Sequence, residues 1–174
     1  PESLHGIVAS KLTCVMTHPL PETHLKTLSE LGRQDILDFS QRFDAIAIGP
    51  GLSQYPETKK LVLWLLQSLD RPIVLDADGI NALADNPKIL DSIKKHTVLT
   101  PHPGEMARLI GMSTQEVQSR RLEVAKMFVK GKKNVTLVLK GYKTIVINED
   151  KFYINETGNP GMATAGAGDV LTGM

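Results

Sequence analysis

The chain has 174 residues, of which 41% are hydrophobic, and its 20 basic and 19 acidic side chains give a formal net charge of +1. This length and apolar content suit one hydrophobic core, so we expect a single domain over residues 1–174. The balanced charge gives no indication of nucleic acid or an anionic membrane as a partner, and the lone Cys14 excludes an internal disulfide and a cysteine zinc cluster.

Two further features of the composition concern location. The longest unbroken apolar run, residues 61–66, is far too short to span a membrane. The first residues lack the basic and then apolar pattern of a secretory signal, and the single cysteine fits a reducing compartment. We therefore expect a cytoplasmic protein.

The first third of the chain predicts a strand and then a helix. Residues 11–17 (KLTCVMT) indicate a buried strand, which a loop with two prolines follows. His18 precedes Pro19, which biases its backbone toward an extended conformation, so it marks the end of this strand more readily than a ligand position. Over residues 33–43, the apolar side chains recur at helical spacing.

Two strand, loop and helix units come next. Residues 44–48 predict a strand, Gly49-Pro-Gly-Leu52 a loop, and residues 56–69 a helix with Pro56 near its first turn. Gly51 would let a flat ligand approach the backbone, although the loop considered alone is more typical of a tight connection. Residues 72–76 predict the second strand, before a short helix that runs through Leu83.

Two carboxylates stand at the end of this second strand. Asp76 and Asp78 could hold Mg²⁺ through water, since magnesium takes few direct protein ligands. The alternative, which we favour from the pattern alone, is that Asp78 or Asn81 caps the next helix by accepting backbone N–H bonds.

The next unit carries a histidine between two prolines. Residues 89–95 predict a helical piece, residues 96–100 a strand, and Pro103 the start of a helix whose first turn suits the acidic Glu105. Pro101 and Pro103 hold His102 stiffly at the carboxyl end of the strand, as suits a contact residue. A surface histidine at this place could also be incidental.

The second half predicts a structural helix and then consecutive strands. Ser113 and Glu116 have the spacing of a capping box, and one helix with an apolar side is expected to run on to Val129. Residues 134–139 predict a strand, and residues 145–147 and 152–154 predict two more around the turn 148–151.

The last eighteen residues, 157–174, contain five glycines. Gly166-Ala-Gly168-Asp169 leads into an apolar pair that predicts a helix start, where unpaired backbone N–H groups favour a phosphate. Asp169 is then a candidate base that accepts the proton of a substrate hydroxyl during phosphoryl transfer. The alternative is a glycine-rich loop that only caps a helix, with Asp169 as a partner of its dipole.

Strands that alternate with helices imply an α/β fold with a mainly parallel sheet, covered on both faces, and an antiparallel edge from the last strands. The candidate loops at Gly51, Asp76, His102 and Gly166 all follow strands. We therefore expect them to gather along one rim of the sheet.

Four segments together resemble a known family. A-I-A-I-G-P-G-L (45–52), T-P-H-P-G-E-M-A-R-L (100–109), L-K-G-Y-K-T (139–144) and G-N-P-G-M-A-T-A-G-A-G-D-V-L-T-G (158–173) resemble NAD(P)H-hydrate dehydratase of the ribokinase-like superfamily. The resemblance implies a ribokinase-like three-layer αβα sandwich. It also implies ADP- or ATP-driven dehydration of (S)-NADHX or (S)-NADPHX, with Mg²⁺, in which the ring hydroxyl is phosphorylated and phosphate then leaves.

The resemblance also implies roles for single residues. Asp169 matches the base and a substrate contact, and Gly51 and His102 match contacts to the hydrated dinucleotide. Lys140 and Thr144 can donate hydrogen bonds to phosphate or ribose oxygens of a nucleotide, and Gly141 permits the turn between them. The alternative is an ordinary hairpin turn with solvated lysines. The residues implied to contact the nucleotide are Lys140, Gly141, Tyr142, Lys143, Thr144, Gly166 and Gly168.

Members of this family have a longer N-terminal portion and further helices beyond the match to Met174, so we expect a partial domain that is incomplete at both ends. A homo-oligomer and a fused or partner epimerase domain are also expected. Two alternatives stay open: a small-alcohol kinase of the same superfamily, which releases a stable phosphate ester, and a nucleotide-binding module without catalysis. The sequence does not decide between ADP and ATP, or between NADHX and NADPHX.

Overall fold

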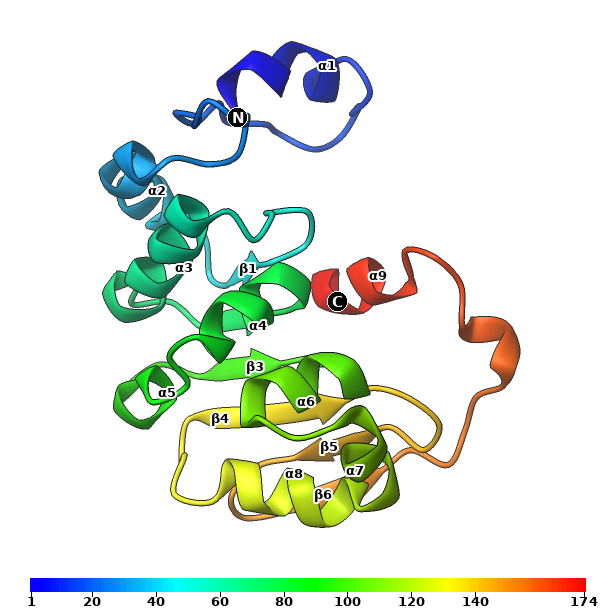
Figure 1. Ribbon diagram of the computed structural model, residues 1–174. Coiled ribbons are helices and arrows are strands. Elements are labelled where there is room, and N and C mark those ends of the chain that lie inside the picture. The colour runs from blue at the N-terminus through cyan, green and yellow to red at the C-terminus, as the bar shows by residue number, and fades with distance from the viewer.

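A computed structural model describes residues 1–174 and contains one six-stranded sheet in the order β1-β2-β3-β4-β5-β6 (Figure 1). Strands β1 to β4 pair in parallel, whereas β5 and β6 pair in antiparallel fashion. This arrangement confirms the predicted mainly parallel sheet with an antiparallel edge. The strands are β1 (Ile46–Ile48), β2 (Ile73–Leu75), β3 (Thr97–Leu99), β4 (Val135–Leu139), β5 (Ile145–Ile147) and β6 (Phe152–Ile154).

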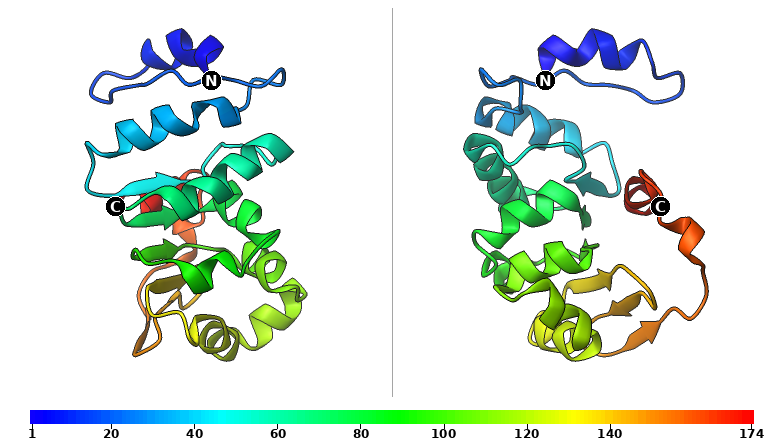
Figure 2. Two further views of the ribbon diagram at one scale, coloured as in Figure 1. Left: turned by 90° about the vertical axis from the view of Figure 1, so that its left-hand side faces the viewer. Right: turned by 45° about the vertical axis from the view of Figure 1, so that its right-hand side comes forward.

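Helices α3 to α8 lie on one face of this sheet, as the two views of Figure 2 show. Between them and the sheet lies a core of 28 buried apolar residues, to which β2, β4 and β5 contribute alternate side chains and β3 contributes Leu99. No helix is long and apolar enough to cross a membrane. The helices are α1 (His5–Ala9), α2 (Arg33–Ser40), α3 (Pro56–Ser68), α4 (Ala77–Ala84), α5 (Ile89–Ser92), α6 (Pro103–Ile110), α7 (Thr114–Ser119), α8 (Arg121–Val129) and α9 (Ala167–Gly173).

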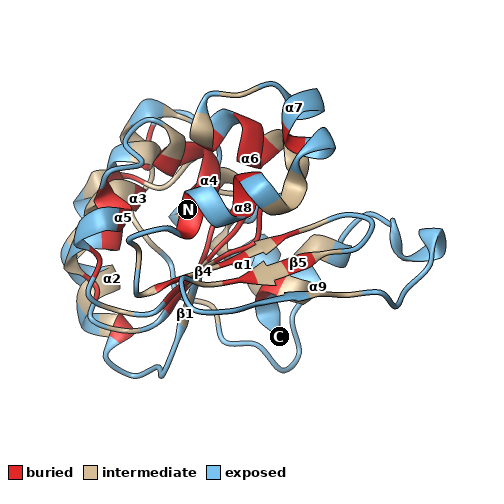
Figure 3. Cartoon of the chain, turned by 90° about the horizontal axis from the view of Figure 1, so that it is seen from below, coloured by how far each residue is buried: buried red, intermediate tan, exposed pale blue.

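The opposite face of the sheet is largely open. Its apolar side chains are half-buried, as at Val74, Val98 and Val146, or exposed, as at Ala47. Figure 3 shows α9 on this side, across the sheet from α3 to α8. Of the two helical layers that the expected sandwich requires, the first is present in α3 to α8, and the second face, predicted to be covered, carries only the short helix α9.

The strand predicted over residues 11–17 is wrong. These residues follow α1 as a turn and an irregular segment, and the side chains of Val15 and Met16 are 64% and 83% exposed. A strand needs a neighbour to satisfy its backbone groups, and the first strand of the sheet is β1. The apolar side chains of this segment thus do not contribute to the core.

The helix predicted from Ser113 to Val129 has the expected start but is not continuous. Ser113 and Glu116 form the predicted capping box, and Val117 is fully buried. At Arg120 the backbone leaves the helical region, with φ −131° and ψ 36°, so that α7 and α8 are separate helices. Just after the break, the Arg121 guanidinium donates to the carbonyl oxygens of Leu139 and Lys140 at the end of β4.

Candidate active site

Four loops meet at the carboxyl edge of the parallel strands. Because β1 to β4 are parallel, the residues that follow them stand at one edge of the sheet, which in Figure 1 is the side toward α9. Gly51 follows β1, Asp76 follows β2, His102 follows β3 and Lys140 follows β4. The predicted gathering along one rim is thus confirmed for the loops at Gly51, Asp76 and His102, and Lys140 joins them there.

The Asp76 side chain, after β2, is hydrogen-bonded to residues after β3 and β4 and to helix α9. Its Oδ1 accepts hydrogen bonds from Lys140 Nζ at 2.7 Å and from the Thr100 hydroxyl at 2.8 Å, and its Oδ2 accepts one from the Thr172 hydroxyl at 2.9 Å. The donors come from the ends of β4 and β3 and from α9. Sequence reasoning missed Thr100 and Thr172, because the bonds to Asp76 span 24 and 96 residues.

The Asp76 carboxylate is charged although it is only 2% exposed. Burial by itself raises the pKa of a carboxyl group, but the hydrogen bonds from Lys140, Thr100 and Thr172 and the charge of Lys140 outweigh it and hold the Asp76 pKa below its ordinary value. Asp76 stands at the N-cap position of α4 without any side-chain cap bond. Its lone pairs face the lysine and the threonines instead.

Asp78 ties the loop after β1 to α4. Its Oδ2 accepts the Ser53 backbone N–H at 2.9 Å, and its Oδ1 accepts from the Asn81 side chain at 3.1 Å. The Asn81 side-chain oxygen Oδ1 in turn accepts a hydrogen bond from Arg108 Nε of α6 at 2.9 Å. The predicted capping of α4 by Asp78 or Asn81 is therefore wrong: Asp78 does bind a backbone N–H, but that group belongs to another loop.

The structure shows no group of three or more His, Cys, Asp or Glu side chains that could hold a metal ion. Asp76, one of the two carboxylates considered for Mg²⁺, already accepts bonds at both of its oxygens. A magnesium ion held through water at Asp76 and Asp78 would need no such cluster and stays a prediction.

The loop after β1 has an unusual backbone. Gly49, Gly51 and Ser53 have φ values of +142°, +70° and +74°, a backbone conformation that residues with a Cβ rarely adopt. A Cβ added at Gly51 would meet nothing within 4 Å, and this glycine is exposed. The backbone at Gly51 is thus open to the close approach of a flat ligand.

His102 is the N-cap of α6. Its Nδ1 accepts the backbone N–H groups of Gly104 and Glu105 at 3.0 and 3.1 Å, and Glu105 Oε2 accepts the backbone N–H of His102 at 2.8 Å. With Nδ1 as acceptor, the neutral ring carries its proton on Nε2, and the side chain is half exposed. The Glu three residues after His102 is the signal that could have revealed this capping box.

Replacement of His102 by alanine is expected to destabilise the fold by about 1 kcal/mol, since two backbone N–H groups of α6 lose their acceptor. His102→Asn keeps an acceptor at the N-cap and is expected to recover most of this loss. Urea denaturation of both variants measures the difference. Equal stabilities of the two variants would contradict the capping role.

The turn from Lys140 to Thr144 is mostly open to solvent. Gly141 has φ +133° and Lys143 has φ +54°, the Thr144 hydroxyl donates to the Gly141 carbonyl at 2.9 Å, and Tyr142 is 87% exposed. Only Lys140 turns inward, toward Asp76. The described contacts thus distinguish Lys140 from the rest of the predicted nucleotide loop.

Helix α9 brings the glycine-rich segment to the same place. Gly166 is its N-cap, with φ +83°, and a Cβ built on Gly168 would lie 3.5 Å from Lys140 Nζ and 3.8 Å from Asp76 Oδ2. Asp169 is in the first turn and exposed. The structure therefore joins Lys140 and Gly168 around Asp76, while Gly51 and His102 stand on neighbouring loops of the same edge.

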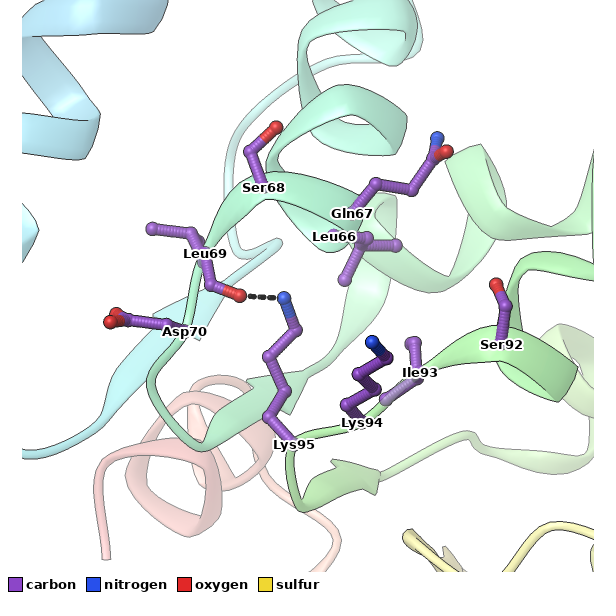
Figure 4. A pocket seen from close by; sticks show the side chains of 9 residues that line it. All are labelled: Leu66, Gln67, Ser68, Leu69, Asp70, Ser92, Ile93, Lys94 and Lys95. Atoms are coloured by element: carbon purple, nitrogen blue, oxygen red, sulfur yellow. Dashed lines mark hydrogen bonds between the residues drawn. The ribbon is translucent and has the colours of Figure 1, made fainter.

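A separate hollow of about 520 Å³ lies between the C-terminal end of α3 and the segment before β3 (Figure 4). Within it, the Lys95 ammonium donates to the Leu69 carbonyl, and burial lowers the pKa of Lys95. Its lining residues precede β2 and β3, so this hollow is at the amino edge of the sheet, opposite the four loops.

This fold is that of the ribokinase-like class. A ribokinase-like superfamily protein from Enterococcus faecalis matches it with a TM-score of 0.69 at 24% identity, over 83% of this chain and 50% of that chain. The chain belongs to the NAD(P)H-hydrate dehydratase family, whose model matches residues 4–174. The resemblance seen in the four sequence segments is thereby confirmed.

Two named relatives have closer sequences. The bifunctional NAD(P)H-hydrate repair enzyme Nnr of Moorella thermoacetica is 47% identical over 175 residues, which cover 100% of this chain and 33% of the relative. An ADP/ATP-dependent NAD(P)H-hydrate dehydratase from Bacillus subtilis, co-crystallised with ATP and Mg²⁺, is 36% identical with a TM-score of 0.61, over 75% of this chain and 45% of that chain. The chain thus spans about a third of the curated relative and under half of the solved structure.

Proposed function

We propose that this chain contributes to the repair of nicotinamide cofactors, as an ADP- or ATP-dependent lyase that dehydrates (S)-NADHX or (S)-NADPHX to NADH or NADPH. The observation that carries the proposal is the position of the Lys140 ammonium beside Gly168, one residue before Asp169. A cation and a carboxylate on adjoining segments suit a reaction that transfers a phosphoryl group to a hydroxyl. Membership of the NAD(P)H-hydrate dehydratase family supports the same reaction.

In this proposal, the hydroxyl oxygen of the hydrated nicotinamide ring attacks the terminal phosphorus of the nucleotide. Asp169 accepts the hydroxyl proton, and Lys140 stabilises negative charge on the phosphoryl oxygens. The nucleotide leaves with one phosphate fewer. The C–O bond to phosphate then breaks and the neighbouring ring carbon loses a proton to water, which forms the double bond of the dihydropyridine. Gly51 and His102, on the neighbouring loops, contact the substrate, and Gly141, Tyr142, Lys143, Thr144 and Gly166 contact the nucleotide.

Mg²⁺ belongs to this proposal as a companion of the nucleotide. Because magnesium takes few direct protein ligands, the ion would be held mostly by phosphate oxygens and water. The proposed setting is the cytoplasm, with residues 1–174 as one partial domain of a homo-oligomer and an epimerase domain fused to it or acting beside it. The name of the bifunctional Moorella thermoacetica relative supports the fused arrangement.

The test is an absorbance measurement in the reduced-nicotinamide band after the chain is mixed with hydrated NADH, Mg²⁺ and either ADP or ATP. A rise that requires the nucleotide is expected, and the more effective nucleotide identifies the phosphoryl donor. The Moorella thermoacetica enzyme serves as the positive control, and omission of the nucleotide as the negative one. A phosphorylated alcohol that accumulates without a rise in absorbance would contradict the lyase and favour a kinase.

A further inference from the structure

We propose that Asp76 is a positioning residue of the nucleotide end of the site, which fixes the Lys140 ammonium and helix α9 in one arrangement. The inference deepens the proposed function and rests on it. Asp76 itself faces no open part of the site, because it is 2% exposed, and it acts through the groups that it binds.

The first support is the convergence of three elements on one carboxylate. Thr100, Lys140 and Thr172 come from the ends of β3 and β4 and from α9, and each donates to Asp76 within 2.9 Å. The two threonines are 3% and 6% exposed, whereas the side chain of Lys140 keeps 21% exposure. The Asp76 carboxylate and the two threonine hydroxyls are thus shielded from solvent, and of the four side chains only Lys140 is partly exposed.

The second support is the weak attachment of α9 by other means. A helix of seven residues is too short to be stable without packing, and Thr172 is the one buried residue of α9. Val170 and Met174 are 64% and 90% exposed. Thr172 Oγ1 lies 2.9 Å from Asp76 Oδ2 and 3.0 Å from the Gly168 carbonyl oxygen of α9 itself, and its bond to Asp76 is the one that attaches this helix to the loop after β2.

The two bonds together set the geometry of the reacting groups. One carboxylate holds Lys140 through Oδ1 and α9 through Oδ2, and Gly168 stands against Lys140 in consequence. Asp169 is the next residue along α9, so its distance from the ammonium depends on Asp76. A displacement of this helix would move the proposed base without removing any group that touches a ligand.

Hydrogen exchange tests the attachment of α9 without any need for turnover. In Thr172→Val, which removes the hydroxyl but keeps the shape, the backbone amides of residues 170–174 are expected to exchange about tenfold faster, as the loss of one hydrogen bond to a charged group predicts. Thr172→Ser restores the hydroxyl and the slow exchange. Thr97→Val, the same change at the other end of β3, leaves α9 unaffected. Unchanged exchange in Thr172→Val would overturn the proposal.

Calorimetric titration with ADP and Mg²⁺ tests the hold on Lys140, and the sign of the effect decides. If Asp76 positions Lys140, Asp76→Asn weakens ADP binding by about tenfold, since the ammonium loses its anchor. If Asp76 merely neutralises Lys140, removal of the negative charge strengthens ADP binding and overturns the proposal. Failure of the unchanged chain to bind ADP would contradict the proposed function alone, and the exchange measurement then decides the role of Asp76.

Discussion

Replacement of Asp169 by asparagine is expected to lower the rate of NADHX dehydration by a factor of about 10² to 10⁴, the usual contribution of a general base. The amide has nearly the shape of the carboxylate but cannot take the hydroxyl proton. Asp169 is exposed in the first turn of α9, so the change removes no packing. The rate is measured by absorbance in the reduced-nicotinamide band, and ADP affinity, measured by calorimetry, is expected to change little.

Asp150→Asn is the matched control for this experiment. Asp150 is also exposed, but it belongs to the turn between β5 and β6, which is not one of the loops at the carboxyl edge of the parallel strands. Its replacement is expected to leave the rate unchanged. Retained activity in Asp169→Asn would contradict the role of Asp169 as the base, whatever else the site binds.

Gly49→Ala is expected to destabilise the fold by about 3 to 5 kcal/mol, among the largest effects of a single substitution. A Cβ at this position would come within 1.7 Å of the Asp76 carbonyl oxygen and 3.0 Å of the Gly79 nitrogen, both backbone atoms that cannot turn aside. The φ of +142° adds strain for any residue with a side chain. The free energy of unfolding in urea measures the loss.

Gly6→Ala is the control for the same exchange of hydrogen for methyl. Gly6 lies in α1, has no positive φ and has nothing within 4 Å of an added Cβ. Its replacement is expected to be neutral or to stabilise the chain by up to about 1 kcal/mol, as helix propensity predicts. If Gly49→Ala were as stable as Gly6→Ala, the close packing of the loop after β1 against Asp76 would be refuted.

The alternation of strands and helices could be predicted from local sequence because each unit carries its own boundaries. Apolar runs such as residues 72–76 end at polar or glycine residues, and Pro56 and Pro103 stand at the first turns of α3 and α6. Residues 11–17 have a similar composition, yet no strand forms there. Whether a segment is a strand depends on a partner elsewhere in the chain, which the segment itself does not encode.

The candidate site shows the same division between local and distant information. The shared edge of the loops at Gly51, His102 and Lys140 follows from the parallel direction of β1 to β4, which the alternation of strands and helices implies. The role of Asp76 does not, because Thr100, Lys140 and Thr172 lie 24, 64 and 96 residues away. From its neighbours alone, Asp76 is a candidate magnesium ligand beside a helix start. Tertiary structure gave this carboxylate other partners.

The strand order has a consequence for the order of folding. Each strand pairs with the next one along the chain, so the sheet can grow by closing one short connection after another, and the entropy of each closure stays small. The bond from Thr172 to Asp76 instead closes a segment of 96 residues. Docking of α9 thus requires the closure of a longer segment than any pairing of neighbouring strands. Helix α9 also has no site to dock against before β2, β3 and β4 have paired. The proposed base, Asp169, is therefore expected to dock last, onto strands that are already paired.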